Sequence, residues 1–206
     1  MKLQIRTAFV ILLFLAFPHH ARAQEVAAPV FQDGDSWQFK IDSSKYTASV
    51  QINTFLNGTY EVVFRGGEFK IFEMKGSDKT EIADSLGMLL TLFGKGNWHG
   101  GQFLSFPLSV GKKWAHEYRA PYLGDRTPHS WHVEINVTGK ESVTTPTGTF
   151  DAFKIQNYQS TESKITFNYL YSPETKSIVK LSFLGKTGSG AGGKTDITLI
   201  QFTPRK

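Results

Sequence analysis

Hydrophobic and polar residues alternate along most of the chain after residue 30, a pattern typical of strands that are buried on one face. Trp37, Phe39 and Ile41 show it early, and similar runs recur to the C-terminus. Turn residues separate these runs, as at Asn57-Gly58 and at Pro146-Thr147-Gly148. We therefore expect an all-β fold, a mostly antiparallel sandwich or open barrel.

One segment departs from this alternation. Between Asp78 and Phe93 the apolar residues fall at helical spacing, and they are Ile82, Leu86, Leu89, Leu90 and Phe93. Ser77 and Gly94 are suitable caps for such a helix, whereas Gly87 disfavours it and a strand over 88–93 is the alternative. We expect a helix over about 78–93, beside the curved sheet and bordering any cavity in it.

The first 23 residues have the three parts of a secretory signal peptide. Lys2 and Arg6 precede a ten-residue apolar run from Ala8 to Phe17, and Ala21-Arg22-Ala23 is a small-x-small cleavage site. The run is shorter than the roughly 20 residues that span a bilayer, so we expect cleavage after Ala23 and no stable membrane span afterwards. The predicted location is periplasmic or secreted.

Behind the signal peptide we expect a lead-in over 24–30 and a single β domain over 31–206. A Gly-x-x-Trp motif occurs twice, at Gly34–Trp37 and at Gly111–Trp114, each before an aromatic-rich strand. Two related halves, 31–76 and 103–206, are therefore one interpretation, and chance similarity between β-meanders is the other.

Charge and cysteine content exclude several classes of protein. The whole chain carries +5, but loss of Lys2, Arg6 and Arg22 leaves 20 basic residues against 18 acids, a net +2. Because the remaining basic residues are dispersed, we expect no nucleic-acid binding. The absence of cysteine excludes disulfides, thiol catalysis and Cys-ligated zinc, and fits a bacterial envelope protein.

Residues 188–195 match the phosphate-binding P-loop expression, with Gly193-Lys194-Thr195 at its end. That motif requires a helix after the loop, but residues 196–202 alternate as a strand does. We interpret the match as a glycine-rich hairpin loop and expect no nucleotide to bind.

The candidate catalytic and metal-binding groups do not converge. His129 and His132 would lie on opposite faces of one strand, and a site joining His116 to His129 would lack a nearby carboxylate. Glu117 and Glu134 could face each other in the same hairpin, but a polar outer face predicts the same arrangement. We assign no catalytic residue, metal or cofactor, and whether the protein is an enzyme stays open, with a non-catalytic role favoured.

Aromatic residues beside Arg and His are the best candidates for ligand contacts, because loops with such residues often bind partners. They fall at positions 98–99 and between positions 116 and 131, and they are Trp98, His99, His116, Tyr118, Arg119, Tyr122 and Trp131. The alternative is that these rings close the ends of the β core.

Three motifs carry a resemblance to known proteins: residues 106–114 (FPLSVGKKW), residues 145–155 (TPTGTFDAFKI) and residues 171–174 (YSPE). Together they resemble a group of uncharacterised bacterial exported β-domains that are classed as domains of unknown function. The resemblance implies a β fold in the bacterial envelope, and it brings no catalytic residues with it.

The expected function is non-catalytic binding of an apolar or amphipathic small molecule, lipid-like in character, or of an envelope protein partner. Curved sheets that are rich in aromatic residues commonly hold such ligands. The alternatives are a hydrolase acting on envelope carbohydrate or peptide, and a purely structural interaction module.

Overall fold

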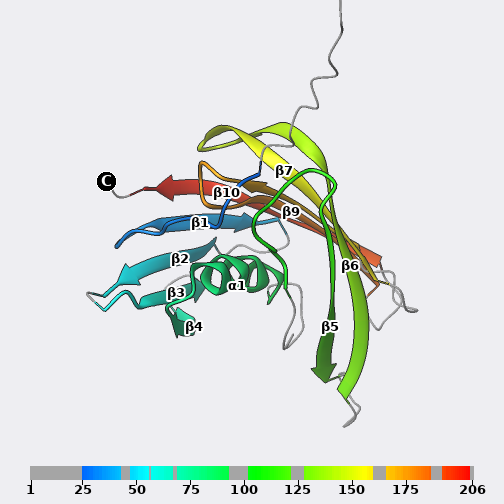
Figure 1. Ribbon diagram of the computed structural model, residues 1–206, viewed down its shortest axis with the longest axis horizontal. Helices are drawn as coiled ribbons and strands as arrows, with labels where there is room; N and C mark the ends of the chain where they lie inside the picture. Colours follow the sequence, from blue (N-terminus) through cyan, green and yellow to red (C-terminus); the bar gives the residue numbers. More distant parts are fainter. Residues whose placement is uncertain are drawn as a thin grey trace, which may run out of the picture.

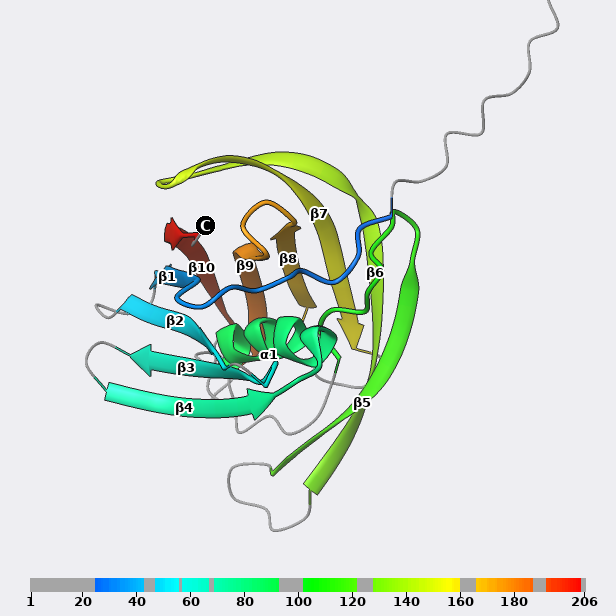
Figure 2. The same ribbon diagram turned by 60° about the vertical axis from the view of Figure 1, so that its left-hand side comes forward.

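The computed structural model describes residues 25–42, 47–55, 57–66, 69–92, 102–121, 128–159, 166–186 and 192–204. Across these residues ten strands form one antiparallel sheet in the order β4-β3-β2-β1-β10-β9-β8-β7-β6-β5. The sheet is strongly curved but not closed, with β4 at one end and β5 at the other (Figures 1 and 2). This confirms the mostly antiparallel, open all-β fold.

The described residues contain ten strands and one helix. Their bounds are β1 Ser36–Ile41, β2 Thr47–Thr54, β3 Tyr60–Gly66, β4 Phe69–Gly76, α1 Lys79–Leu92, β5 Lys113–Pro121, β6 Pro128–Thr145, β7 Gly148–Gln159, β8 Thr166–Ser172, β9 Ser177–Lys186 and β10 Gly192–Thr203. Successive strands pair as hairpins within β1–β4 and within β5–β10, and the pairing of β1 with β10 joins these two groups into one sheet. Gly58, in the turn between β2 and β3, has a φ of 77°, as the Asn-Gly pair predicts.

The predicted helix is confirmed as α1, and it lies on the concave face of the sheet (Figure 2). Ile82, Ala83 and Leu86 are buried, and the helix contacts β3, β4 and β9. The helix begins one residue after Asp78, whose carboxylate accepts a hydrogen bond from the Thr80 N–H at 2.7 Å. Asp78, rather than the predicted Ser77, therefore makes this capping bond.

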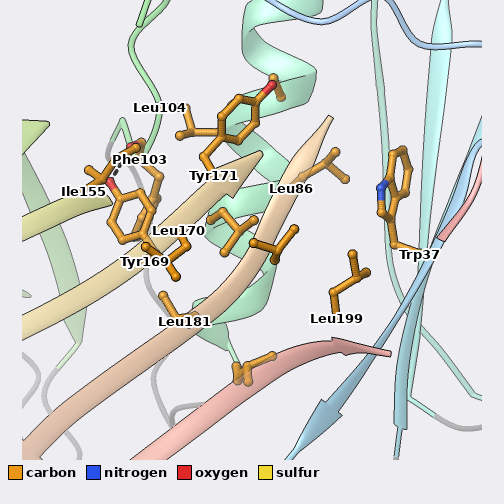
Figure 3. Packing of buried hydrophobic residues seen from close by; sticks show 14 of the residues in the cluster. Trp37, Leu86, Phe103, Leu104, Ile155, Tyr169, Leu170, Tyr171, Leu181 and Leu199 are labelled. Atoms are coloured by element: carbon orange, nitrogen blue, oxygen red, sulfur yellow. Dashed lines mark hydrogen bonds between the residues drawn. The ribbon is translucent and has the colours of Figure 1, made fainter. Parts of the chain in front are cut away.

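The segment after the helix fills the middle of the concave face. Phe103 and Leu104 are each 1% exposed, and Phe103 lies against the rings of Phe167 and Tyr169. Tyr169 donates its hydroxyl hydrogen to the Phe103 carbonyl oxygen at 2.5 Å (Figure 3). We call residues 102–104 the plug, because they occupy the space that a ligand would take inside a curved sheet.

An N-terminal strap, residues 25–35, crosses the end of the curved sheet on the same side as α1 (blue in Figure 2). One end is held by a β-bridge between Val26 and Leu108. At the other end Phe31 packs edge-on against Trp37, and buried Asp35 pairs with Lys176 at 2.7 Å. Strap, plug and α1 together cover the concave face with the protein's own chain.

Candidate functional site

Most of the aromatic candidates lie at the far end of the β5–β6 hairpin or outside the described residues. Trp98, His99 and Tyr122 fall outside them. Tyr118 and Trp131 lie directly opposite each other in the β5–β6 pairing, and Arg119 lies opposite Ser130. The backbone register thus pairs two of the predicted positions, and their role in binding stays a prediction.

His116 is partly buried and lies beside the plug, and its role in binding stays a prediction. Its ring lies 6.2 Å from that of Phe103 in the plug. Burial lowers its pKa to about 4, against a backbone hydrogen bond at Gln102 that raises it, with a small further lowering from His132. His116 is therefore neutral at pH 7, as expected for a partly buried core histidine.

The pairing of β5 with β6 separates the two histidines of the suggested metal site, whereas it places Glu117 directly opposite His132. His116 lies opposite Val133, whereas His129 lies opposite Ala120. Glu117 lies opposite His132 and not opposite Glu134, so the suggestion that the two glutamates face each other is wrong. Within the described part of the chain no cluster of three His, Cys, Asp or Glu residues could hold a metal ion.

Asp84 also has a strongly perturbed pKa, and it too contacts the plug. Its Oδ1 accepts a hydrogen bond from the Leu104 N–H at 2.7 Å. Burial raises its pKa to about 7, although backbone hydrogen bonds from Leu104 and Phe103 oppose this rise. Because its carboxylate holds the plug against α1, Asp84 has a structural role here.

One open hollow lies on the convex face, the side of the sheet opposite α1. The β6–β7 hairpin curls back over this face, above β8, β9 and β10, in both views (Figures 1 and 2). As a result β6 contacts β10 even though three strands separate them in the sheet. A bulge between Val137 and Gly139 marks the start of the curled part. We call this part, residues 139–152, the arch.

Beneath the arch is an open groove of about 460 Å³. Two arch residues and eight residues of the sheet line it: Glu141, Val143, Lys154, Gln156, Asn168, Tyr169, Leu170, Lys180, Ser182 and Lys194. Apolar burial holds the arch in place, since Val143, Phe150 and Ala152 on the arch and Leu170 on the sheet are all at most 9% exposed. The groove therefore has a fixed roof and a mixed polar and apolar lining.

Three lysines and two carboxylates set the charge of this groove. Lys154 pairs with Glu141 at 3.3 Å, and Lys194 pairs with Asp196 at 2.8 Å. Burial raises the pKa of Asp196, but hydrogen bonds from Lys194 and Ser182 and the charges of Lys194 and Lys180 outweigh it, so the pKa lies below its usual value. With Asp196 ionised, it is unsuited to act as a general acid at neutral pH.

A second open hollow, of about 440 Å³, adjoins the first on the same face. It is lined by residues of β5, β6 and β7: Lys113, Trp114, Ala115, Glu134, Ile135, Asn136 and Tyr158. Asn136 lies opposite Gln156 of the first groove, and the Tyr158 hydroxyl donates to Gln156 Oε1 at 2.7 Å. The two hollows thus meet at Gln156.

Apart from Lys194 in the P-loop match, the polar groove residues do not stand out in the sequence, where they belong to ordinary alternating strands. Lys154 lies between Phe153 and Ile155, and Lys180 lies between Val179 and Leu181. Alternation indicates an outward face but not that a distant hairpin covers it. The one available signal is the length of β6, because its 18 residues extend beyond the pairing with β5.

Of the P-loop match over 188–195, only residues 192–195 lie within the part of the chain that the structure describes. Gly192, Gly193, Lys194 and Thr195 belong to β10, so a strand follows where the P-loop needs a helix. The side chain of Lys194 lies at the groove instead.

Comparison with solved structures identifies proteins of similar fold. A Bacteroides fragilis protein, provisionally described as exported and with a YmcC-like fold, superposes with a TM-score of 0.53 at 12% identity, covering 87% of this chain and 100% of the other. A protein from Parabacteroides distasonis, provisionally described as a lipoprotein, gives 0.48 at 12% identity, covering 86% and 99%. The lipoprotein YmcC from Escherichia coli gives 0.40 at 9% identity, covering 84% and 87%.

The first of these comparisons shows that the chain shares its fold with the YmcC-like Bacteroides protein. No family model matches the chain, and no curated protein matches its sequence. None of the helices in the described part of the chain has the length and apolar content needed to cross a bilayer.

Proposed function

We propose that this is a non-catalytic binding protein of the bacterial envelope, and that its ligand site is the convex groove beneath the arch. The observation that carries the proposal is the groove itself, about 460 Å³ in volume and roofed by residues 139–152. That volume falls in the range of small-molecule sites. The concave face, where the aromatic content first suggests a ligand, is covered by α1, the plug and the strap.

The lining favours an amphipathic small molecule. Val143 and Leu170 contribute apolar surface, while Gln156, Asn168 and Lys180 contribute polar groups. Catalysis by a carboxylate pair is not supported, because Glu141 and Asp196 are each ion-paired with a lysine.

The envelope location rests on the signal peptide predicted over residues 1–23 and on the description of a protein of similar fold as exported. Expression in a bacterial host with cell fractionation and N-terminal sequencing tests it. The expected result is a periplasmic or extracellular product that begins at Gln24, and a cytoplasmic product that begins at Met1 would refute it.

The absence of cysteine allows a direct test of the groove. Glu141→Cys places one thiol on the groove side of the arch, and Ser142→Cys places one on the opposite side, since neighbouring residues of a strand alternate between faces. Both positions are exposed, so a bulky maleimide should react at either.

Binding of decyl-chain probes is then measured by native mass spectrometry and calorimetry, with decanoate, decyl phosphate, decyl maltoside and decyltrimethylammonium. We expect at least one probe to bind to the mature protein and its binding to be lost in the labelled Glu141→Cys variant but kept in the labelled Ser142→Cys variant. Equal binding by both labelled variants, or binding of no probe, would overturn the proposed site.

A further inference from the structure

The positive charge of the groove is not fully balanced by its own acids. Lys154 and Lys194 each have a carboxylate partner, Glu141 and Asp196. Lys180 has no ion-pair partner among the described residues, although its charge acts on nearby Asp196. Three ammonium groups against two carboxylates leave one positive charge in surplus, and Lys180 carries it.

The hydrogen bonds on the groove floor have a consistent direction. The Tyr158 hydroxyl donates to Gln156 Oε1, and Gln156 Nε2 donates to Asn168 Oδ1 at 3.1 Å. Ser182 donates to Asp196 Oδ1 at 2.6 Å. These bonds occupy one acceptor site on each of the two amide oxygens, while the Lys180 ammonium and the Asn168 amide N–H groups remain as donors for a ligand.

The free donors lie close together. Asn168 lies opposite Ser182, and Lys180 lies opposite Leu170, so Asn168 and Lys180 lie on adjacent strands and on the same face. Leu170 lies between Lys154 and Lys180 across β7, β8 and β9. An apolar side chain is therefore flanked by the ammonium groups, with the amide nitrogen of Asn168 one step along the strand.

We propose that the groove binds its ligand through an anionic group, a carboxylate or a phosphate, held by the Lys180 ammonium and the Asn168 amide N–H, with the apolar part of the ligand against Val143 and Leu170. This inference rests on the proposed function and deepens it by naming the ligand class. Anions accept from several donors at once, and hydrogen bonds to a charged group are stronger than neutral ones. A cationic or uncharged head group would not neutralise the surplus positive charge on Lys180.

The test compares the same four decyl probes on the mature protein and on two groove variants. Decanoate and decyl phosphate should bind, while decyl maltoside and decyltrimethylammonium should bind at least tenfold more weakly. Lys180→Gln should weaken binding of both anions at least tenfold, and Asn168→Asp should do the same because it replaces a donor with a like charge. Lys113→Gln, which removes an exposed lysine outside this groove, is the matched control and should bind as the parent does.

Inorganic phosphate and acetate distinguish the two sources of the anionic group. If either competes with the decyl probes at concentrations near that of the probe, the head group alone is recognised and a free anion is the source. If neither competes, an amphipathic lipid-like anion is the source. Calorimetry in rising salt should show that the anionic probes bind more weakly as ionic strength increases.

The outcomes separate this inference from the proposed function. If Lys180→Gln and Asn168→Asp bind the anions as the parent does, while labelling of the Glu141→Cys variant still blocks binding, the groove stands and the anionic assignment is wrong. Tighter binding of the cationic probe than of the anions would likewise overturn it. Circular dichroism shows whether both variants keep their fold, and so does retained binding of an uncharged probe. These controls exclude unfolding as the reason for weaker binding of the anions.

Discussion

The two faces of this sheet are formed by the same strands but are covered differently. Phe153 and Lys154 are neighbours in β7, and Leu181 and Lys180 are neighbours in β9. The apolar member of each pair lies on the concave face beneath α1, the plug and the strap. The charged member lies on the convex face, where a single hairpin covers it and leaves a groove.

The difference between the faces separates stability from binding. Covering apolar rings with the protein's own chain removes them from water and stabilises the fold. A partial roof over charged and amide side chains leaves polar groups accessible to a ligand. Substitutions on the concave face should therefore change the free energy of unfolding, and substitutions on the convex face should change binding.

The largest expected effect is that of Phe103→Ala in the plug. Phe103 is 1% exposed and touches three aromatic rings, so its loss leaves a cavity and should lower the free energy of unfolding by about 3–5 kcal/mol. Urea unfolding followed by fluorescence measures it. Phe55→Ala is the control, because Phe55 is 44% exposed and should change stability by less than about 1 kcal/mol. Equal effects would mean that the plug is not part of the core.

A smaller loss is expected from Asp35→Ala in the strap. This change removes the carboxylate that accepts from Lys176 at 2.7 Å and from the Gln32 N–H at 2.9 Å. Lys176 has a φ of 57°, a strained value for a residue other than glycine, and the ion pair helps to hold it there. The free energy of unfolding should fall by about 2–3 kcal/mol in denaturant titrations. An unchanged midpoint would show that the strap is held without this contact.

The free energy of unfolding should depend on pH through the titration of Asp84 and His116, which both contact the plug. The pKa of Asp84 is raised in the folded state to about 7. Its contribution to the free energy of unfolding is therefore fully present below its unfolded pKa and is lost as pH rises toward 7. The pKa of His116 is lowered to about 4, so its contribution is present above pH 6.5 and is lost as pH falls toward 4. Between pH 4 and 6.5 the two effects oppose each other.

Two variants resolve these opposing effects. In Asp84→Asn only the His116 effect remains, and stability should rise with pH between 4 and 6.5. In His116→Phe only the Asp84 effect remains, and the free energy of unfolding should fall by on the order of 2 kcal/mol between pH 4 and 7. This is about half of the value that the full change in the pKa of Asp84 would give, because part of the carboxyl group reaches solvent. Thermal unfolding across this range measures both, and identical pH profiles for the two variants would contradict the assignment.

The smallest expected effect on stability is that of Lys180→Gln on the convex face. Lys180 is exposed and has no ion-pair partner among the described residues, so the free energy of unfolding should change by less than about 0.5 kcal/mol. Denaturant unfolding of this variant beside Phe103→Ala measures the contrast between the faces. A loss comparable with that of Phe103→Ala would mean that the convex face also carries the fold.

Local patterns along the sequence predict the elements well, because each depends on residues near one another. Alternation at Trp37, Phe39 and Ile41 predicts β1, and helical spacing at Ile82 and Leu86 predicts α1. The strand after the glycine-rich loop is also confirmed as β10, which argues against the P-loop interpretation.

The groove could not be predicted in this way, because it depends on contacts between distant segments. Its roof carries Glu141 and Val143, and its floor extends to Lys194. Alternation shows that Lys154 and Lys180 point outward but says nothing about a hairpin that bends over them. The plug cannot be predicted locally either, since Phe103 lies in a loop and is buried against rings from the distant strands β5 and β8.

The pairing of β1 with β10 has a consequence for how the chain is made. Every other pair of neighbours in the sheet is consecutive along the chain, whereas Ser36 meets Thr203 near the other end. During synthesis, β1 therefore has one edge without its partner until the last strand emerges, and unpaired edges recruit other strands. A chain that stops short of residue 192 leaves two meanders without the strand that joins them, so the twelve residues of β10 decide whether folding ends in a finished sheet or in aggregation.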